Sequence, residues 1–237
     1  MNIIVTGASR GIGYETARTF AIEPGNNVIV ISRNDKNLKL LRQECLEEFP
    51  EAKLYIIPFD LENLDGIETE LAKMIMEQID SLDILINNAG FLVKSPADKI
   101  DFQESERMLK INLLAPLALV RSLKPLLEKS RHAHVLNIGS MAGVQGGEKF
   151  PGLSLYSASK AGLHALTECL AEEYRERGIC FNALALGAVQ TEMLAEAFPG
   201  LKAPLKASEM ANYIHDFALK GHRYYNGKIL PVTTSTP

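Results

Sequence analysis

Short apolar runs, separated by segments of helical periodicity, extend along almost the whole chain. In these runs Val, Ile and Leu follow one another without strict polar alternation, which is typical of parallel strands covered on both faces. The runs span residues 3–5, 28–31, 54–57, 82–86, 135–138, 181–186 and 228–232. The pattern therefore predicts about seven parallel strands.

The intervening segments predict helices. Apolar residues recur every three or four positions within 38–49, 67–75 and 163–174, which gives each segment one apolar face. The segment 101–128 is long and apolar in its middle, and it predicts a buried helix. Pro116 should bend or break that helix unless the neighbouring structure absorbs the kink.

The alternation of strands and helices predicts an α/β fold with one doubly wound parallel sheet and right-handed crossovers. No repeat or linker divides the chain, so we expect a single domain over residues 1–237. Ligands of such sheets bind beyond the carboxyl ends of the strands. The motifs discussed below lie at or just beyond those ends.

Composition narrows the class of protein. Lys plus Arg is 25 and Asp plus Glu is 29, so the net charge of −4 provides no basic field for nucleic acid. No apolar stretch approaches the roughly 20 residues that span a bilayer, and the first residues do not resemble a signal peptide. We therefore expect a cytoplasmic protein with neither nucleic-acid nor membrane partners.

The cysteines and histidines predict no disulfide and no metal site. Cys45, Cys169 and Cys180 form no C-x-x-C pair and are interpreted as three small buried apolar side chains. The five histidines form neither an H-x-x-x-H motif nor a cluster with cysteine.

Glycines punctuate the connection between the first predicted strand and its helix. In residues 6–13 (TGASRGIG) they are Gly7, Gly11 and Gly13. Glycine permits a tight turn and close approach to a ligand, and the N–H groups of the helix start suit a pyrophosphate. The spacing differs from the common G-x-G-x-x-G fingerprint, so a purely structural turn is an alternative, but the strand-to-helix position favours a dinucleotide site.

The end of the second predicted strand indicates which dinucleotide binds. An acidic residue there would bind the ribose hydroxyls of NAD. This chain has Ser32 and Arg33 instead, with Arg10 in the glycine turn. A guanidinium matches the 2′-phosphate of NADP, so we predict NADP; NAD is an alternative, as is an Arg33 that merely begins a solvated loop.

Tyr156 and Lys160 are four residues apart at the start of a predicted helix, so they share a face. The ammonium group should lower the phenol pKa and prepare Tyr156 for acid–base work. Ser140 ends the fifth predicted strand and could polarise a carbonyl together with Tyr156. Asn112, within the long apolar helix, could hold a proton-relaying water. The alternatives are an incidental Tyr–Lys pair, a turn serine, and an amide that satisfies the backbone of a bent helix.

These motifs, in this order, resemble the short-chain dehydrogenase/reductase family over nearly the whole chain. Besides the glycine turn, Asp60-Leu61 resembles the adenine-contacting pair and residues 87–90 (NNAG) resemble the element after the fourth strand. Asn112, Ser140, Tyr156 and Lys160 resemble the catalytic tetrad. The resemblance implies a Rossmann-type sheet, NAD(P) binding and a homodimer or homotetramer.

The resemblance also implies hydride transfer to a substrate carbonyl, with Tyr156 as proton donor, Ser140 stabilising the alkoxide, Lys160 tuning Tyr156, and Asn112 supporting a water relay. The substrate would be a small carbonyl or alcohol compound, such as a ketone or a 3-oxoacyl thioester. The residues predicted to bind the cofactor are Gly7, Ser9, Arg10, Gly11, Ile12, Gly13, Ser32, Arg33, Asp60, Leu61, Asn88, Ala89, Gly90, Tyr156, Lys160, Val189 and Thr191.

The chain departs from the family pattern around the substrate. Leu186 stands where the family has proline, although Val189 and Thr191 still match. The interval between Ser140 and Tyr156 is long and glycine-rich, which predicts an extended loop beside the substrate pocket. The short segment 191–208 predicts a small or open substrate cover. The altered proline position leaves a second hypothesis, a non-catalytic dinucleotide-binding sensor or scaffold, although such a protein would not need the whole tetrad.

Overall fold

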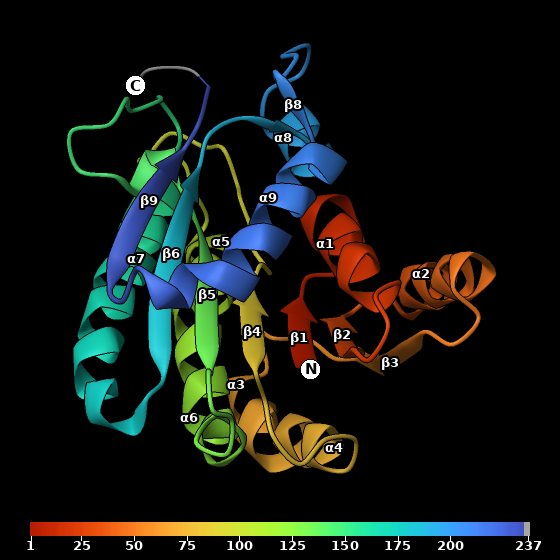
Figure 1. The fold of residues 1–237 in the computed structure, drawn as a ribbon. Coiled ribbons are helices and arrows are strands. Elements are labelled where there is room, and N and C mark those ends of the chain that lie inside the picture. Colours follow the sequence, from red (N-terminus) through yellow and green to blue (C-terminus); the bar gives the residue numbers. More distant parts are fainter. Residues whose placement is uncertain (235–237) are drawn as a thin grey trace.

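The computed structural model describes residues 1–234 (Figure 1). Seven parallel strands form one sheet in the order β3-β2-β1-β4-β5-β6-β9, which confirms the predicted doubly wound Rossmann-type fold. The strands are β1 (Asn2–Thr6), β2 (Asn27–Ser32), β3 (Lys53–Pro58), β4 (Ile84–Asn87), β5 (His134–Ser140), β6 (Cys180–Leu186) and β9 (Lys228–Val232). The last three residues of the predicted domain, 235–237, lie outside the described residues.

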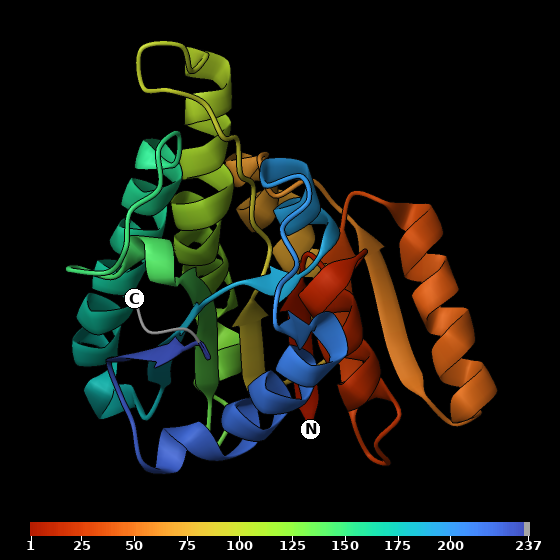
Figure 2. The same ribbon diagram turned by 90° about the horizontal axis from the view of Figure 1, so that it is seen from above.

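Helices cover both faces of the sheet (Figures 1 and 2). One face carries α1 (Gly11–Ala21), α2 (Asp35–Glu48) and α9 (Ala207–Lys220). The other face carries α4 (Ala72–Met76), α6 (Ala115–Leu127) and α7 (Ser154–Glu173). The shorter elements include α3 (Leu64–Gly66), which a π-helical turn over Ile67–Leu71 joins to α4, and also α5 (Phe102–Leu109) and α8 (Glu192–Ala197). A separate pair of strands, β7 (Val189–Gln190) and β8 (Leu205–Lys206), was not predicted from the sequence.

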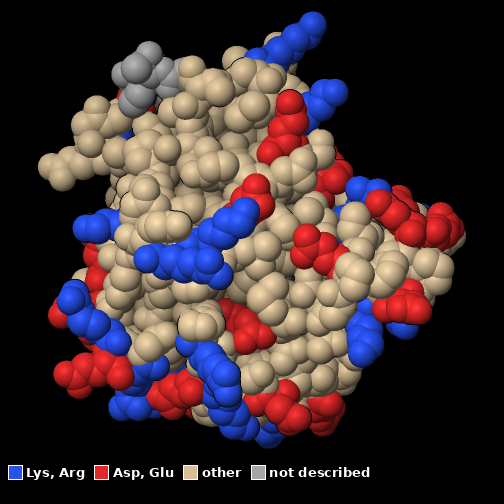
Figure 3. Space-filling model, viewed as in Figure 1, with Lys and Arg blue, Asp and Glu red and all other residues tan. Residues whose placement is uncertain are grey.

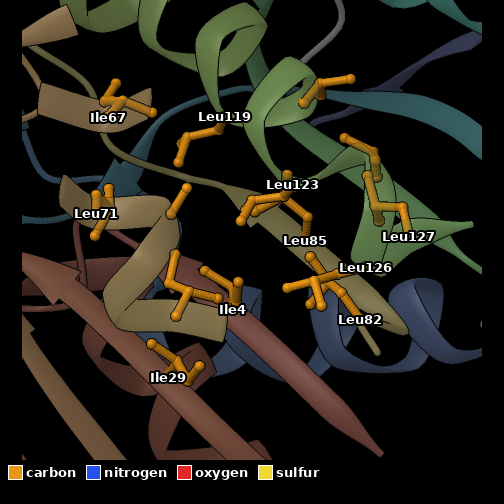
Figure 4. Packing of buried hydrophobic residues seen from close by; sticks show 14 of the residues in the cluster. Ile4, Ile29, Ile67, Leu71, Leu82, Leu85, Leu119, Leu123, Leu126 and Leu127 are labelled. Carbon is orange, nitrogen blue, oxygen red and sulfur yellow. The ribbon is translucent and has the colours of Figure 1, made fainter. Parts of the chain in front are cut away.

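The unbroken apolar runs supply two cores, one on each face. Along β1, Ile3 and Val5 belong to the cluster beneath α1 and α9, whereas Ile4 belongs to the cluster beneath α4 and α6. Figure 4 shows the second cluster, where Leu119 and Leu123 of α6 pack against the strands. Because neighbouring strand residues point to opposite faces, a strand between two helix layers needs apolar residues at consecutive positions.

The long segment 101–128 is helical but not uniform. A π-helical turn over Lys110–Leu114 separates α5 from α6, and Pro116 lies in the first turn of α6. Proline lacks the amide hydrogen that a regular α-helix would direct to the Asn112 carbonyl, and it clashes with that carbonyl. The widened turn absorbs this conflict, so the helix axis continues past Pro116.

Two smaller expectations were wrong. Strand β4 begins at Ile84, not at residue 82, because the Leu82 N–H donates to the Leu126 carbonyl oxygen of α6 at 3.0 Å and not to a neighbouring strand. Cys169 is exposed on α7 and Cys180 is only partly buried in β6, although Cys45 is buried as expected.

The surface carries charges of both signs. Figure 3 shows basic and acidic side chains interspersed on the face that it draws. No helix within residues 1–234 has both the length and the apolar character needed to cross a membrane.

Candidate active site

A cleft of about 570 Å³ opens at the carboxyl edge of the sheet, where β1 and β4 neighbour each other and the strand order reverses. With the single exception of Asn112, every predicted site residue lines it. These residues are Gly7, Ser9, Arg10, Gly11, Ile12, Gly13, Ser32, Arg33, Asp60, Leu61, Asn88, Ala89, Gly90, Ser140, Tyr156, Lys160, Val189 and Thr191. The carboxyl ends of parallel strands meet at one edge, which explains why motifs far apart in sequence converge here.

The glycine turn leaves no room for side chains. Gly7 has φ +69°, and a methyl group on it would lie 2.7 Å from the Cα of Ala89. A methyl group on Gly13 would lie 2.2 Å from Nδ2 of Asn88 and 2.5 Å from the carbonyl oxygen of Gly7. The bare backbone therefore forms a shallow cradle at the start of α1, which fits the pyrophosphate of a dinucleotide.

Asn88 connects this turn to the end of β4. Its side-chain amide donates to the carbonyl oxygens of Thr6 (2.9 Å) and Gly7 (3.3 Å). In return, the Thr6 hydroxyl oxygen accepts from the backbone N–H groups of Asn88 (3.1 Å) and Ala89 (3.0 Å). The Asn88 side chain thus holds the backbone of the glycine turn in place through the carbonyl oxygens of Thr6 and Gly7.

Both arginines predicted to bind a 2′-phosphate lie at the cleft, and each has a carboxylate partner. Nη1 of Arg33 is 3.7 Å from Oδ2 of Asp60, and Nη1 of Arg10 is 2.7 Å from Oε1 of Glu196 in α8. Near them the hydroxyl of Ser32 donates to that of Ser9 at 2.8 Å. Two cations and two hydroxyls at one end of the cleft suit a phosphate dianion. Sequence reasoning missed Glu196, which lies 186 positions from Arg10.

Tyr156, Ser140 and Lys160 converge at the other end. The Ser140 hydroxyl lies close enough to the Tyr156 phenol to lower the phenol pKa by hydrogen bonding. Nζ of Lys160 donates to the Ile138 carbonyl oxygen at 2.8 Å and lies 6.0 Å from the centre of the Tyr156 ring. Helix α7 positions both side chains on one face, and the end of β5 supplies Ser140 to the same cleft.

The expected lowering of the Tyr156 pKa is not found. Burial raises the pKa of Tyr156, and the hydrogen bond from Ser140 opposes this only in part; Lys160 does not contribute. Burial also lowers the pKa of Lys160 to about 8. In the free protein the ammonium group is directed at the Ile138 carbonyl oxygen and not at the phenol, so it does not lower the Tyr156 pKa. The pair therefore contains a phenol that keeps its proton and a lysine that titrates near neutral pH.

Asn112 lies outside the cleft wall and is fully buried. Its Oδ1 accepts from the N–H of Phe91 at 2.8 Å, and its Nδ2 donates to the Phe91 carbonyl at 2.9 Å and to the Ser159 hydroxyl at 3.0 Å. Protein partners thus engage both ends of the side-chain amide. The alternative of an amide bonded to the backbone of its own bent helix is wrong too, because the partners lie in the segment after β4 and in α7. A water held by Asn112 would have to use its backbone carbonyl in the π-helical turn.

Two segments form the outer walls of the cleft: the loop between Ser140 and α7, and α8 with the residues that follow it. The long loop borders the cleft as expected, and Lys149 holds it by donating to the carbonyls of Ala142 (2.8 Å) and Val144 (2.6 Å). Phe150 of this loop meets Phe198, which follows α8, edge to face with ring centres 6.0 Å apart. Sequence reasoning did not identify the individual wall residues, which include Leu92, Met141, Glu148, Phe150, Leu153, Met193, Leu194, Ala197, Phe198 and Leu201.

The departures at the sixth strand leave the local fold intact. Leu186 is the last residue of β6, pairs with Val232 and is buried. Thr191 caps α8, since its hydroxyl accepts from the N–H of Leu194 at 3.3 Å. Within residues 1–234, no group of three or more His, Cys, Asp or Glu side chains is arranged to hold a metal ion.

Known proteins resemble this chain in both sequence and structure. The family model for short-chain dehydrogenases matches residues 1–202. A 3-oxoacyl-acyl-carrier-protein reductase of Rickettsia typhi is 36% identical over 191 residues, which cover 80% of this chain and 73% of that protein.

Solved structures agree over nearly the full length. A Shigella flexneri 2a protein described as a short-chain dehydrogenase, crystallised with NADP, is 29% identical with a TM-score of 0.86, covering 97% of this chain and 95% of its own. RhlG of Pseudomonas aeruginosa, in an active-site complex with NADP, is 27% identical with a TM-score of 0.84, covering 98% of this chain and 94% of its own.

Proposed function

The chain belongs to the short-chain dehydrogenase family, and from this premise we propose that it is an NADPH-dependent reductase of carbonyl compounds. The observation that carries the proposal is the convergence of Tyr156, Ser140 and Lys160 on the cleft that also contains the glycine turn. A protein that only bound a dinucleotide would need the turn but not this arrangement.

The cofactor would lie along the cleft from Arg33 to Tyr156. The cradle of Gly7 and Gly13 takes the pyrophosphate, and Arg10 and Arg33 take the 2′-phosphate. Val189 and Thr191 contact the nicotinamide end. When bound, NADPH supplies the hydride for the carbonyl carbon. The relatives from S. flexneri and P. aeruginosa, both crystallised with NADP, support this choice, and NAD is the alternative.

Tyr156 is the general acid. Its phenol, whose pKa burial raises, is protonated at neutral pH and is directed into the cleft beside Ser140. A substrate carbonyl oxygen between the two hydroxyls accepts the phenol proton as its negative charge develops. The Ser140 hydroxyl donates a second hydrogen bond to that oxygen and stabilises the alkoxide.

Lys160 supports this step electrostatically. Its pKa of about 8 lets it hold a proton near the phenol at neutral pH and release it just above. The Asn112 side chain holds the segment after β4 against α7 through Phe91 and Ser159. A proton-relaying water would therefore bind the backbone carbonyl of Asn112.

The substrate is a ketone or a 3-oxoacyl compound. The outer cleft is mainly apolar, with Leu153, Met193 and Phe198 in its wall, and suits a carbonyl compound that carries an apolar chain or ring. The relative from R. typhi, a 3-oxoacyl reductase, supports the acyl alternative.

The test is NADPH oxidation against a panel of ketones, diketones and 3-oxoacyl thioesters. Tyr156→Phe should lose a factor of about 10² to 10⁴ in turnover while NADPH affinity is retained. Tyr213→Phe, on the exposed side of α9, is the matched control and should behave as wild type. Full turnover by Tyr156→Phe would exclude Tyr156 as the acid, and NADPH binding without oxidation by any compound would favour the sensor or scaffold.

We also propose one domain over residues 1–237 that works in the cytoplasm as a homodimer or homotetramer. The continuous seven-stranded sheet and the resemblance to the family support this assignment. Light scattering on the purified chain gives the assembly size, and a monomer at micromolar concentration would refute it.

A further inference from the structure

Helix α8 touches both functional ends of the cleft. Its start lies on the cofactor cradle. A methyl group placed on Gly11 would lie 3.4 Å from Cγ2 of Thr191 and 3.4 Å from Oε2 of Glu192. Its apolar side lines the substrate end through Met193, Leu194 and Ala197. With only six residues, α8 depends on side-chain contacts for its position.

One of those contacts is an ion pair to the cofactor turn itself. Oε1 of Glu196 accepts from Nη1 of Arg10 at 2.7 Å. The Arg10 side chain is 48% exposed and the Glu196 side chain 65% exposed, so a competing anion from solvent can reach the guanidinium. Arg10 is also one of two arginines at the end of the cleft proposed to bind a 2′-phosphate.

We propose that Glu196 is a positioning residue that holds α8 onto the cofactor turn through Arg10, and that the 2′-phosphate of NADPH displaces it. A phosphate dianion matches the fork of a guanidinium as a carboxylate does, but it carries about twice the negative charge. NADH has no 2′-phosphate and leaves the Arg10–Glu196 pair in place. Binding of NADPH, but not of NADH, therefore releases the helix that covers the substrate end, which makes the substrate site respond to the identity of the cofactor. This inference rests on the proposed function.

The first test is cofactor affinity, measured by calorimetry without any substrate. Glu196→Gln removes the competitor, so the Kd for NADPH should fall by about two- to fivefold, the range of an exposed ion pair, while the Kd for NADH stays unchanged. The control is Glu172→Gln, which breaks a similarly exposed glutamate–arginine pair with Arg175 at the far end of α7. It should change neither Kd.

A double-mutant cycle separates competition for Arg10 from simple charge repulsion. In an Arg10→Ala background, Glu196→Gln should no longer affect the Kd for NADPH, because the two residues act through one contact. An equal gain in both backgrounds would mean that the carboxylate repels the phosphate directly, and this would overturn the proposal.

Hydrogen exchange reports on α8 itself. In the free protein, Glu196→Gln should speed amide exchange in residues 194–198, whereas Glu172→Gln should not. Saturating NADPH should abolish the difference between wild type and Glu196→Gln, and saturating NADH should preserve it. A difference that persists equally with both cofactors would overturn the release step.

The affinity measurements separate this proposal from the proposed function. Wild type that binds neither dinucleotide would overturn both proposals. Wild type that binds NADPH with a Kd unchanged by Glu196→Gln would overturn the Glu196 proposal alone.

Discussion

His134 makes the folded protein sensitive to acid. The residue begins β5 and is fully buried. Its Nδ1 is 2.9 Å from the Ala218 carbonyl oxygen, which requires a proton on Nδ1, and its Nε2 is 3.1 Å from the side-chain amide of Asn182, which requires a lone pair. A second proton would turn Nε2 into a donor that faces another donor.

Burial accordingly lowers the pKa of His134 from 6.5 to about 4. Between these pH values His134 binds a proton in the unfolded chain but not in the folded chain, so the free energy of unfolding falls as the pH falls. At about 1.4 kcal/mol per unit, the full loss is about 3.5 kcal/mol, and about 2 kcal/mol of it has occurred by pH 5. This stabilisation is complete above pH 6.5 and is lost as the pH approaches 4.

Urea unfolding at pH 7, 6 and 5 measures this loss. His134→Asn cannot titrate, so its free energy of unfolding should be lower at pH 7 but should fall about 2 kcal/mol less than wild type between pH 7 and 5. His132→Asn, two positions earlier and exposed, is the control and should retain the wild-type slope. His164, whose pKa burial also lowers to about 4, leaves some acid sensitivity in every variant. Equal losses for wild type and His134→Asn would refute the argument.

Three further predictions concern the cleft. Gly13→Ala places a methyl group 2.2 Å from the Asn88 amide, so the cradle must open, and the Kd for NADPH by calorimetry should rise about tenfold or more; an unchanged Kd would contradict the cradle. Arg33→Ala should lower the ratio of NADPH to NADH turnover about tenfold, and an unchanged ratio would remove Arg33 from phosphate recognition. The rate of reduction should fall above about pH 8 as Lys160 loses its proton, and Lys160→Arg, which stays charged, should remove that inflection; an inflection that persists would assign it to another group.

The sheet could be predicted because its signal is local. A strand buried on both faces needs consecutive apolar residues, and Ile3, Ile4 and Val5 supply both cores from three adjacent positions. The pair β7–β8 could not be predicted in this way, since two-residue strands carry no periodicity. The π-helical turn was only half predicted: Pro116 indicates a conflict with the Asn112 carbonyl, but the sequence does not say whether the helix bends, breaks or widens.

The convergence of the candidate residues on one cleft could be predicted where topology alone brings residues together. Parallel strands deliver Gly7, Ser140 and Thr191 to one edge whatever the details of packing. The ion pair between Arg10 and Glu196, and the contact of Phe150 with Phe198, depend on how two surface segments settle against each other. No spacing rule relates such residues, so the structure was needed to find them.

The expectation for Tyr156 failed for a reason that bears on the direction of the reaction. Spacing places Lys160 on the same face of α7, but spacing does not show that its ammonium donates to the Ile138 carbonyl, nor how far burial penalises a phenolate. A phenol with a raised pKa is already protonated at neutral pH, so it can donate its proton to an alkoxide directly. In alcohol oxidation the same phenol would have to begin as the phenolate that burial disfavours. The electrostatics of the free protein therefore favour carbonyl reduction, and we expect the reductive rate to be nearly constant below about pH 8 while the oxidative rate rises with pH throughout.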